Sequence, residues 1–366
     1  MHRILYYIDP LFQETQAQPP GQPWLTAIPG LSAALPGYRH LALSFDPGTQ
    51  MEAQSGLELL FLPLPRISFR SPQQDRNRTL RQWLQDPAHT LLVQFSAADW
   101  LSVPGARSLL FTSEADVQQA ARQRQQAWQE ASLILLPYEQ DRLSLAEAYP
   151  QIAPRMATLF PALEEPVEAL GWAGQEQVKL KYTNGRDYCL YAGPLSEEAG
   201  VIQALKAYSN FKKWLLTGMP MVLAGPHTAD TDRLEKKLET YKYKADISLY
   251  ADLEEEEWKN LVAGAYMMVC PAATGYAQPI AWAHSAGTPV VTVNDLRLRE
   301  WVGTAAAWSE PGDLEQLAHS MMLLYKDENT RSQLIEKGRE QAARQKRTDT
   351  IAALAGHIRA LLEGNG

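Results

Sequence analysis

Short hydrophobic runs recur along the whole chain, and longer amphipathic segments separate them. The runs have the length and the apolar character of buried β-strands, and the segments between them have the spacing of helices. This alternation predicts parallel sheets covered by helices, the α/β class. The expected strands are Ile4–Ile8, Leu41–Phe45, Leu59–Leu62, Thr90–Phe95, Ser108–Thr112, Ser132–Leu136, Tyr188–Ala192, Met221–Ala224, Ile247–Tyr250, Ala265–Cys270 and Pro289–Val293.

Helices are expected in the intervals between these strands and after the last one. One of them opens on a run of acidic residues, "LEEEEWKN", where a helix dipole favours negative charge. The expected helices are Trp24–Leu35, Asn77–Gln85, Glu114–Ala131, Gln140–Ala148, Ala199–Thr217, Asp230–Tyr241, Leu253–Ala263, Pro279–Ala286, Leu314–Tyr325, Asn329–Gln345 and Thr348–Leu362.

The length of the chain, 366 residues, exceeds one ordinary hydrophobic core and predicts two domains. Residues Pro166–Gly185 are polar, and we expect them to be irregular and to contain the boundary. After them the alternation of strand and helix is regular, as in a doubly wound sheet.

The charge and the cysteines narrow the class of protein. The net charge of −8 argues against nucleic-acid binding, and Lys206, Lys212 and Lys213 are read as the solvated side of a helix. Cys189 and Cys270 lie in apolar runs without metal-binding spacing, which suits two buried thiols in a reducing compartment. No run approaches the length of a membrane span, and the first residues lack the core of a signal peptide. We therefore expect a cytoplasmic protein, with peripheral attachment to a membrane left open.

One segment of the second half has the frame of a ligand-binding loop. "TGYAQPIAWAHSAGTPVV", Thr274–Val291, contains a glycine, a proline, a helix of small residues and a buried strand, but no carboxylate. A second such place is "PLFQETQAQPPGQPWLT", after the first strand, where sheets of this class put a ligand loop. A plain surface connection explains that second segment equally well.

Four segments of the second half, in order, resemble a known family. They are "YCLYAGPLSEEAGVIQALKAYSNF", "MVLAG", "AYMMVCPAATGYAQPIAWAHSAGTPVVTVND" and "REWVGTAAAWSEPGDLEQLAHSM". Their spacing resembles the nucleotide-sugar half of retaining GT-B glycosyltransferases, and most closely the mannosyl- and glucosyltransferase family of bacterial polysaccharide enzymes. The likeness extends from about Tyr188 to Leu362, whereas the first half matches only in alternation and length.

The resemblance implies two Rossmann-like domains that face a central cleft. The expected ranges are 1–175 for the acceptor-side domain, 176–350 for the donor-side domain, and 351–366 for a last helix beside or across the first domain. It also implies a nucleotide-diphosphate sugar as donor, a glycan or lipid-linked acceptor, and no metal or other cofactor. The loop at Pro20, Gly21 and Gln22 would then lie on the acceptor side.

The charged residues of the family's donor site have no counterpart in this sequence. Two acids of the family fall on Thr274 and Trp282, and an arginine and a lysine that neutralise the diphosphate fall on Pro194 and Ala199. A hydrogen bond to a charged group contributes about 1.5–3 kcal/mol, so the loss of the ribose carboxylate alone weakens a donor roughly tenfold or more. Trp282 either fills the ribose space or packs in the core.

What the sequence shares with the family is the frame of the site. Its glycines and prolines are present, together with an acid after the last strand. His227 ends a strand at the edge where such sheets bind ligands, whereas His284 points about 200° away from Trp282 around its helix. The expected donor-side residues are Gly193, Pro194, Gly225, His227, Thr274, Gly275, Tyr276, Gln278, Pro279, Trp282 and Glu300.

Three functions are compatible with this pattern. The first is a glycosyltransferase that transfers a hexose with an altered or weakened donor site. The second is an inactive homologue that acts as a protein partner or glycan-binding subunit. The third is a sugar-nucleotide epimerase, for which the sequence offers few of the required acid–base residues.

Overall fold

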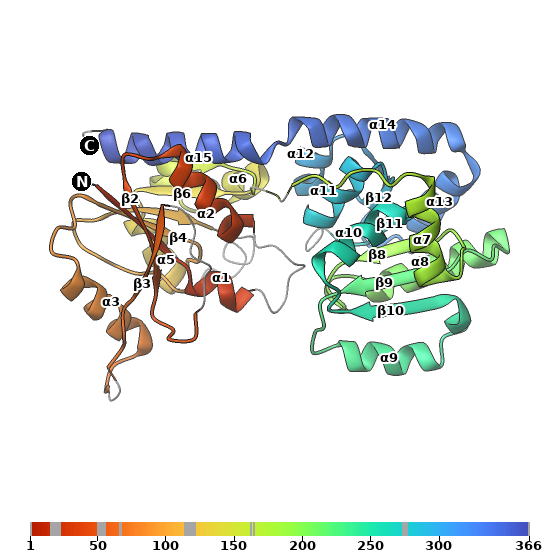
Figure 1. The fold of residues 1–366 in the computed structure, drawn as a ribbon, viewed down its shortest axis with the longest axis horizontal. Helices are drawn as coiled ribbons and strands as arrows, with labels where there is room; N and C mark the ends of the chain where they lie inside the picture. Colours follow the sequence, from red (N-terminus) through yellow and green to blue (C-terminus); the bar gives the residue numbers. More distant parts are fainter. Residues whose placement is uncertain are drawn as a thin grey trace. The chain divides into compact units, whose positions relative to one another are not determined.

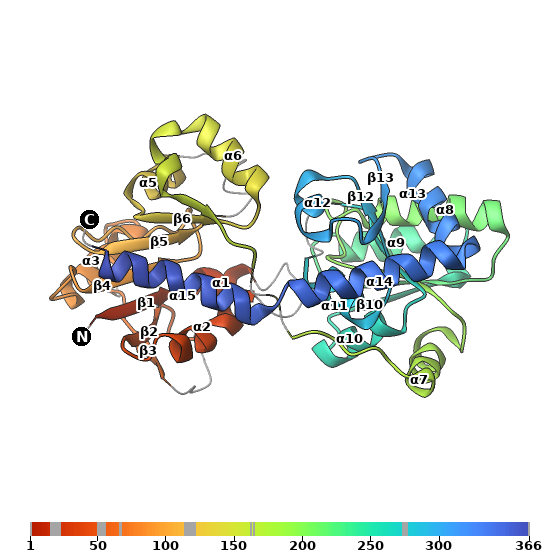
Figure 2. The same ribbon diagram turned by 90° about the horizontal axis from the view of Figure 1, so that it is seen from above.

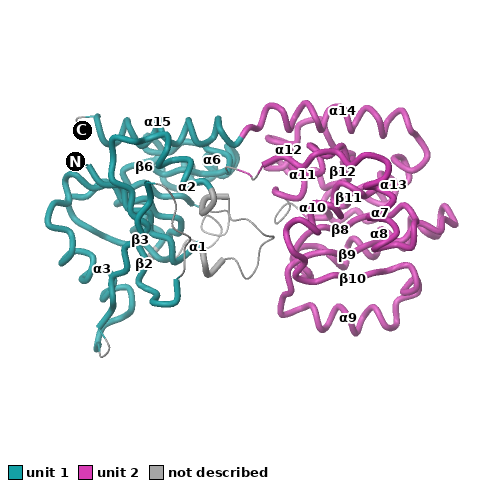
Figure 3. The backbone as a smooth tube through the Cα atoms, viewed as in Figure 1, with its two compact units in different colours: residues 1–14, 23–162, 347–366 teal, residues 15–22, 163–346 magenta. Residues whose placement is uncertain are grey.

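The computed structural model describes residues 2–14, 23–49, 56–65, 68–112, 122–161, 163, 165–272 and 277–364. These residues form two compact units (Figure 3). Unit 1 comprises residues 1–14, 23–162 and 347–366, and the main segment of unit 2 comprises residues 163–346. The first boundary between the two units, after residue 162, lies before the boundary expected after residue 175. The last helix of the chain belongs to unit 1.

Unit 1 contains a seven-stranded sheet of order β3-β2-β1-β4-β5-β6-β7, in which all paired strands are parallel (Figure 1). The strands are almost continuously apolar because helices cover both faces of the sheet. Its elements are β1 (Arg3–Tyr7), α1 (Asp9–Glu14), α2 (Pro23–Ala34), β2 (Arg39–Ser44), β3 (Leu57–Phe61), α3 (Pro72–Trp83), β4 (Thr90–Gln94), β5 (Arg107–Phe111), α5 (Arg122–Glu130), β6 (Leu133–Leu136), α6 (Glu139–Ala148), the 3₁₀ helix η1 (Pro150–Arg155), β7 (Met156–Thr158) and α15 (Arg347–Glu363).

The last helix of the chain completes one core of unit 1. Leu354 and Ile358 of α15 are buried in the same cluster as Ile4 and Leu31. Helices α15 and α2 lie side by side (Figures 1 and 2), and a Cβ on Gly30 would lie only 2.7 Å from Ile351 Cδ1. Close packing of this kind makes α15 an integral part of unit 1.

Unit 2 contains a six-stranded sheet of order β10-β9-β8-β11-β12-β13, again with all pairs parallel. Helices α8 and α13 pack together on one face, and α10 and α11 cover the other (Figure 2). Its elements are α7 (Trp172–Thr183), β8 (Cys189–Ala192), α8 (Val201–Leu215), β9 (Met221–Gly225), α9 (Thr231–Glu239), η2 (Lys244–Asp246), β10 (Ile247–Ala251), α10 (Glu255–Gly264), β11 (Met267–Cys270), α11 (Ala277–Ala286), β12 (Val290–Val293), α12 (Leu296–Val302), β13 (Ala306–Ser309), α13 (Leu314–Lys326) and α14 (Glu328–Arg344).

The prediction of two parallel α/β units is confirmed, and so are the buried thiols of Cys189 and Cys270. The run of glutamates opens α10 as expected, with Glu255 in its first turn. No helix among the described residues is long and apolar enough to cross a lipid bilayer.

Two local expectations were wrong. The segment Pro166–Gly185 is not irregular, because α7 occupies most of it and packs against α10. Lys212 is not solvated: it is 6% exposed, and its Nζ lies 2.8 Å from the carboxylate of Asp246. The rings of Tyr208 and Tyr243 lie within 6 Å of the same ammonium group, at 5.9 and 5.8 Å. A lysine can be buried here because a carboxylate and two aromatic rings compensate its charge.

Candidate functional site

The strand order of unit 2 creates a switch point between β8 and β11. The chain leaves β8 toward β9 on one side and leaves β11 toward β12 on the other. The two connecting loops therefore diverge at the carboxyl edge of the sheet, which is where open α/β sheets bind ligands. Among the described residues expected at the donor side, Gly193 follows β8, Gly225 ends β9, and Gln278 lies in the first turn of α11.

The ends of β8 and β9 approach each other unusually closely. The N–H of Gly193 donates to the carbonyl oxygen of Ala224 over 3.0 Å. A Cβ on Gly225 would lie 1.8 Å from the carbonyl oxygen of Gly193, far inside van der Waals contact. Only glycine fits at position 225, so the first two predicted glycines of the site meet each other.

The loop after β8 is held by a buried tyrosine. The hydroxyl of Tyr191 lies 2.6 Å from the carbonyl oxygen of Pro194 and 3.3 Å from that of Ala199. At the end of this loop Gly200 has a φ of 88°, and a Cβ on it would lie 2.7 Å from Pro271 Cγ. Pro271 follows β11, so the loops after β8 and β11 are in contact at the switch point.

The loops after β9 and β10 join the same network. The backbone N–H of His227 donates to Asp252 Oδ1 over 2.8 Å, and the hydroxyl of Thr228 donates to the carbonyl oxygen of Leu195 over 2.8 Å. The imidazole of His227 is half exposed, with Nε2 3.5 Å from Asp232 Oδ1. His227 thus lies at the carboxyl edge with an accessible ring.

Sequence reasoning missed two of the residues that shape this edge. Tyr191 was counted only as an apolar strand residue, although its hydroxyl positions the loop after β8. Asp252 has a φ of 51°, and its side chain accepts the N–H of His227. An aspartate directly after the strand in "SLYAD" is the signal that could have indicated a polar role at this edge.

Helix α11 places its predicted site residues in different surroundings. Gln278 and Pro279 are buried in its first turn. Trp282 is fully buried, with its ring centroid 6.4 Å from that of Trp258 in α10 and 5.6 Å from Lys259 Nζ. These contacts support the core-packing interpretation of Trp282. The predicted residues Thr274, Gly275 and Tyr276, and the loop residues Pro20, Gly21 and Gln22, lie outside the described residues.

The other face of α11 carries His284, which packs against Gly338 of α14. Its Cδ2 lies 3.1 Å from the position of a Cβ on Gly338, and its ring is 6.3 Å from that of Trp301. Burial lowers the pKa of His284 to about 4. His284 is therefore a neutral core residue at physiological pH, and it is separated from Trp282 by the width of the helix.

Acidification from pH 6.5 toward pH 4 is expected to destabilise unit 2 through His284. In this window the unfolded chain binds a proton that the folded protein excludes. The free energy of unfolding therefore decreases as the pH is lowered. The shift from the ordinary pKa of about 6.5 corresponds to about 3 kcal/mol in total. Urea unfolding across this pH range should show the loss of stability in the wild type. His284→Met should abolish the part of the pH dependence that comes from His284.

The exposed His319 provides the matched control, because its replacement by glutamine leaves the buried imidazole in place. The buried His40, whose pKa burial also lowers, is present in all three proteins and cancels in the comparison. An unchanged pH dependence in His284→Met would show that His284 is not the responsible group.

Cationic side chains of α12 are engaged within unit 2. The guanidinium of Arg299 lies 4.5 Å from the ring centroid of Trp308, and that of Arg297 lies 3.8 Å from Asp295 Oδ2. Glu300 on the same helix is exposed. The expected residue Glu300 is thus accessible, while the arginine beside it is stacked on an aromatic ring.

The electrostatics of the loop after β8 differ from those of a strong diphosphate site. Pro194 is half-buried and Ala199 is 6% exposed, and neither can carry a charge. Glu197 and Glu198 are exposed in the same loop, and Lys237 of α9 reaches it, with Nζ 3.7 Å from Glu197 Oε2. Among the described residues no group of His, Cys, Asp and Glu side chains is arranged to hold a metal ion.

Comparison with known proteins finds similarity in the second half of the chain. Residues 175–341 match the model of the family described as glycosyl transferases group 1. The O-antigen chain mannosyltransferase B of Escherichia coli is 27% identical over 156 residues, which are 42% of this chain and 41% of that protein. The match therefore spans less than half of that relative's length.

Solved structures resemble the chain over nearly its whole length. A sucrose-phosphate synthase from Thermosynechococcus elongatus has a TM-score of 0.76 at 14% identity, with 100% of both chains covered. HepE of Anabaena, solved with UDP and glucose, has a TM-score of 0.76 at 14% identity, covering 98% of this chain and 100% of that chain. WaaG, a glycosyltransferase involved in lipopolysaccharide biosynthesis, has a TM-score of 0.70 at 15% identity, with 100% of both covered. The chain thus shares the two-domain fold of these GT-B glycosyltransferases, and its residues 175–341 match the glycosyl transferases group 1 model.

Proposed function

We propose that this chain binds a nucleotide-diphosphate sugar at the carboxyl edge of the β8–β13 sheet and transfers its hexose to a glycan or lipid-linked acceptor, with weakened use of the donor. The observation that carries the proposal is the contact between the loops after β8, β9 and β11 at the switch point. The mannosyltransferase relative and the neighbour solved with UDP and glucose support a nucleotide sugar as the ligand class.

Backbone groups supply the polar contacts that this edge offers to a diphosphate. The left-handed Gly200 precedes the first turn of α8, so the N–H groups of that turn point toward the loop after β8, where that of Val201 donates to the carbonyl oxygen of Ser196. Because Pro194 and Ala199 are uncharged, neither position adds a cationic side chain to these backbone N–H groups. We infer that donor affinity is lower than in a site with an arginine and a lysine there.

The charges of the loop after β8 favour a second candidate function. The loop has no cation at positions 194 and 199, and it carries Glu197 and Glu198, which repel a diphosphate, while Lys237 offsets only the charge of Glu197. The alternative is therefore an inactive homologue that serves as a partner of an active transferase or as a glycan-binding subunit. Donor binding separates the two functions.

A calorimetric titration of the full chain with UDP-, GDP-, ADP- and dTDP-sugars tests the proposal. We expect weak but saturable binding of one nucleotide class and slow sugar transfer. Pro194→Arg should strengthen that binding about tenfold, because a charge-assisted contact contributes roughly 1.5–3 kcal/mol. Pro194 is half-buried at the loop, so a longer side chain can extend from it.

Gln333→Arg, on the exposed side of α14, adds the same charge away from the loop and is the control for net charge. Equal gains in both variants would show an effect of net charge instead of a contact at the donor site. If neither the wild type nor Pro194→Arg binds any donor while both stay folded, donor binding is excluded and the partner function remains.

A further inference from the structure

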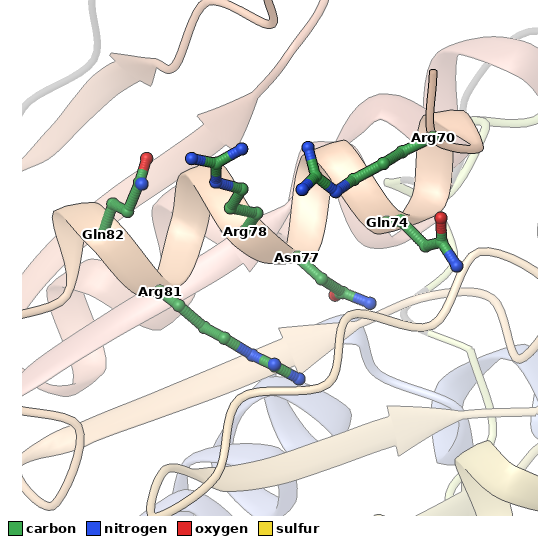
Figure 4. Close-up of a pocket in the computed structure, with 6 residues that line it drawn as sticks. All are labelled: Arg70, Gln74, Asn77, Arg78, Arg81 and Gln82. Carbon is green, nitrogen blue, oxygen red and sulfur yellow. The ribbon is translucent and has the colours of Figure 1, made fainter. Parts of the chain in front are cut away.

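Helix α3 of unit 1 presents a polar face that the donor-site chemistry does not use. Asp75 and Leu80 are buried on its inner side, and a capping box between Ser71 and Gln74 fixes its first turn. The outer side borders a hollow of about 520 Å³ (Figure 4). The described residues that line this hollow are Arg70, Gln74, Asn77, Arg78, Arg81 and Gln82.

Two of the three arginines on this face have no acidic partner among the described residues. Within the described part of the chain, the guanidinium groups of Arg70 and Arg78 have no hydrogen-bond or ion-pair partner. Arg81 donates from Nε and Nη2 to the carbonyl oxygen of Ser102, over 3.0 and 2.7 Å, and its charge also interacts with the carboxylate of Glu130. By contrast, Arg76 on the same helix is paired with an aspartate. A basic face with two such arginines in a chain of net charge −8 indicates an anionic partner.

The spacing of the arginines excludes one small anion as the partner of all three. A helix rises about 1.5 Å per residue, so Arg81 lies roughly 14 Å along α3 from its first residue, Pro72, and Arg70 precedes that residue. A single phosphate cannot bridge that distance, whereas an array of anionic groups can. Gln74 and Gln82 on the same face add hydrogen-bond donors between and beyond the charges.

An exposed aromatic residue adjoins the basic face. Phe69 is fully exposed and directly precedes Arg70. A phenylalanine in water gains no packing, but at a bilayer surface it can insert below the headgroups while the neighbouring arginines contact phosphates. The combination of an array of cations and an apolar side chain suits a lipid surface better than a soluble polyanion.

We propose that the outer face of α3, with Phe69, docks this protein on an anionic lipid bilayer. The arginines contact the phosphates of the lipid headgroups, and Phe69 contacts the apolar region below them. The proposal does not depend on sugar transfer, because binding to lipid is measured without a nucleotide sugar.

Co-sedimentation of the full chain with vesicles tests this docking surface. We expect binding to vesicles that contain phosphatidylglycerol, little binding to pure phosphatidylcholine, and loss of binding as salt is raised. Each basic residue near such a surface contributes about fivefold in affinity, so Arg70→Gln with Arg78→Gln should weaken binding roughly 25-fold. This double variant leaves the Arg81 contact with Ser102 intact and should stay folded, as circular dichroism will show.

The matched control is Lys206→Gln with Lys337→Gln, which removes two exposed charges from unit 2 and should bind vesicles like the wild type. Phe69→Ser should weaken vesicle binding while leaving its salt dependence unchanged. Inorganic phosphate alone is expected not to displace the vesicles at matched ionic strength.

Three results would overturn the proposal. One is a wild-type protein that ignores phosphatidylglycerol, and another is an equal loss of binding in the α3 variant and the control. The third is binding of soluble hyaluronate without binding of vesicles, which would assign the face to an acidic glycan.

Discussion

Replacement of Gly225 by alanine is expected to lower the free energy of unfolding by about 4 kcal/mol or more, among the largest effects of a single substitution. The added methyl group would lie 1.8 Å from the carbonyl oxygen of Gly193. The methyl group is fixed directly to the backbone and the oxygen belongs to it, so relief requires a shift of the end of β8 against that of β9. Urea unfolding followed by circular dichroism measures the loss.

Gly218→Ala is the matched control for this prediction. Gly218 lies just before β9, and a Cβ there would meet no atom within 4 Å. Its replacement should change the free energy of unfolding by less than about 1 kcal/mol. Comparable stability of the two variants would mean that the ends of β8 and β9 can separate easily. A steric clash would then not explain the glycine at position 225.

Replacement of Trp282 by glutamate is expected to cost about 3–5 kcal/mol of stability, even though it returns the carboxylate that the family carries at this position. The change removes a fully buried indole that packs edge-on against Trp258 and leaves a smaller, charged group in its place. Lys259 lies over the indole ring but already pairs with Glu255, so it offsets only part of the cost. Thermal and urea unfolding both report the loss.

Trp282→Phe keeps an aromatic ring against Trp258 and should cost only about 1–2 kcal/mol. A glutamate variant as stable as the phenylalanine variant would show that the side chain at 282 reaches solvent, as a ribose-binding residue must. For the same reason Trp282→Glu alone is a poor test of donor binding. Pro194, which is half-buried in a loop, is the better position for that purpose.

The strand pattern of this chain was readable because both sheets are parallel and covered on both faces. Such strands appear as continuous apolar runs, and those of β1, β4, β8 and β9 agree with the structure to within a few residues. The elements that the pattern missed are short or lack a clean apolar stripe. Strand β7 has three residues, and α7 exposes Trp172 and Leu180 while burying Val178.

The sequence by itself determined the α/β class, the two parallel units and the absence of charge at Pro194 and Ala199, because these depend on residue type and local periodicity. The tertiary structure alone decided where side chains and backbones meet: that Gly225 contacts the carbonyl oxygen of Gly193, that Trp282 faces α10, and that Lys212 is buried beside Asp246. Periodicity gives the direction of a side chain from its own helix or strand. Whether water, an aromatic ring or a carboxylate lies in that direction depends on segments that are distant in the chain and that only packing brings together.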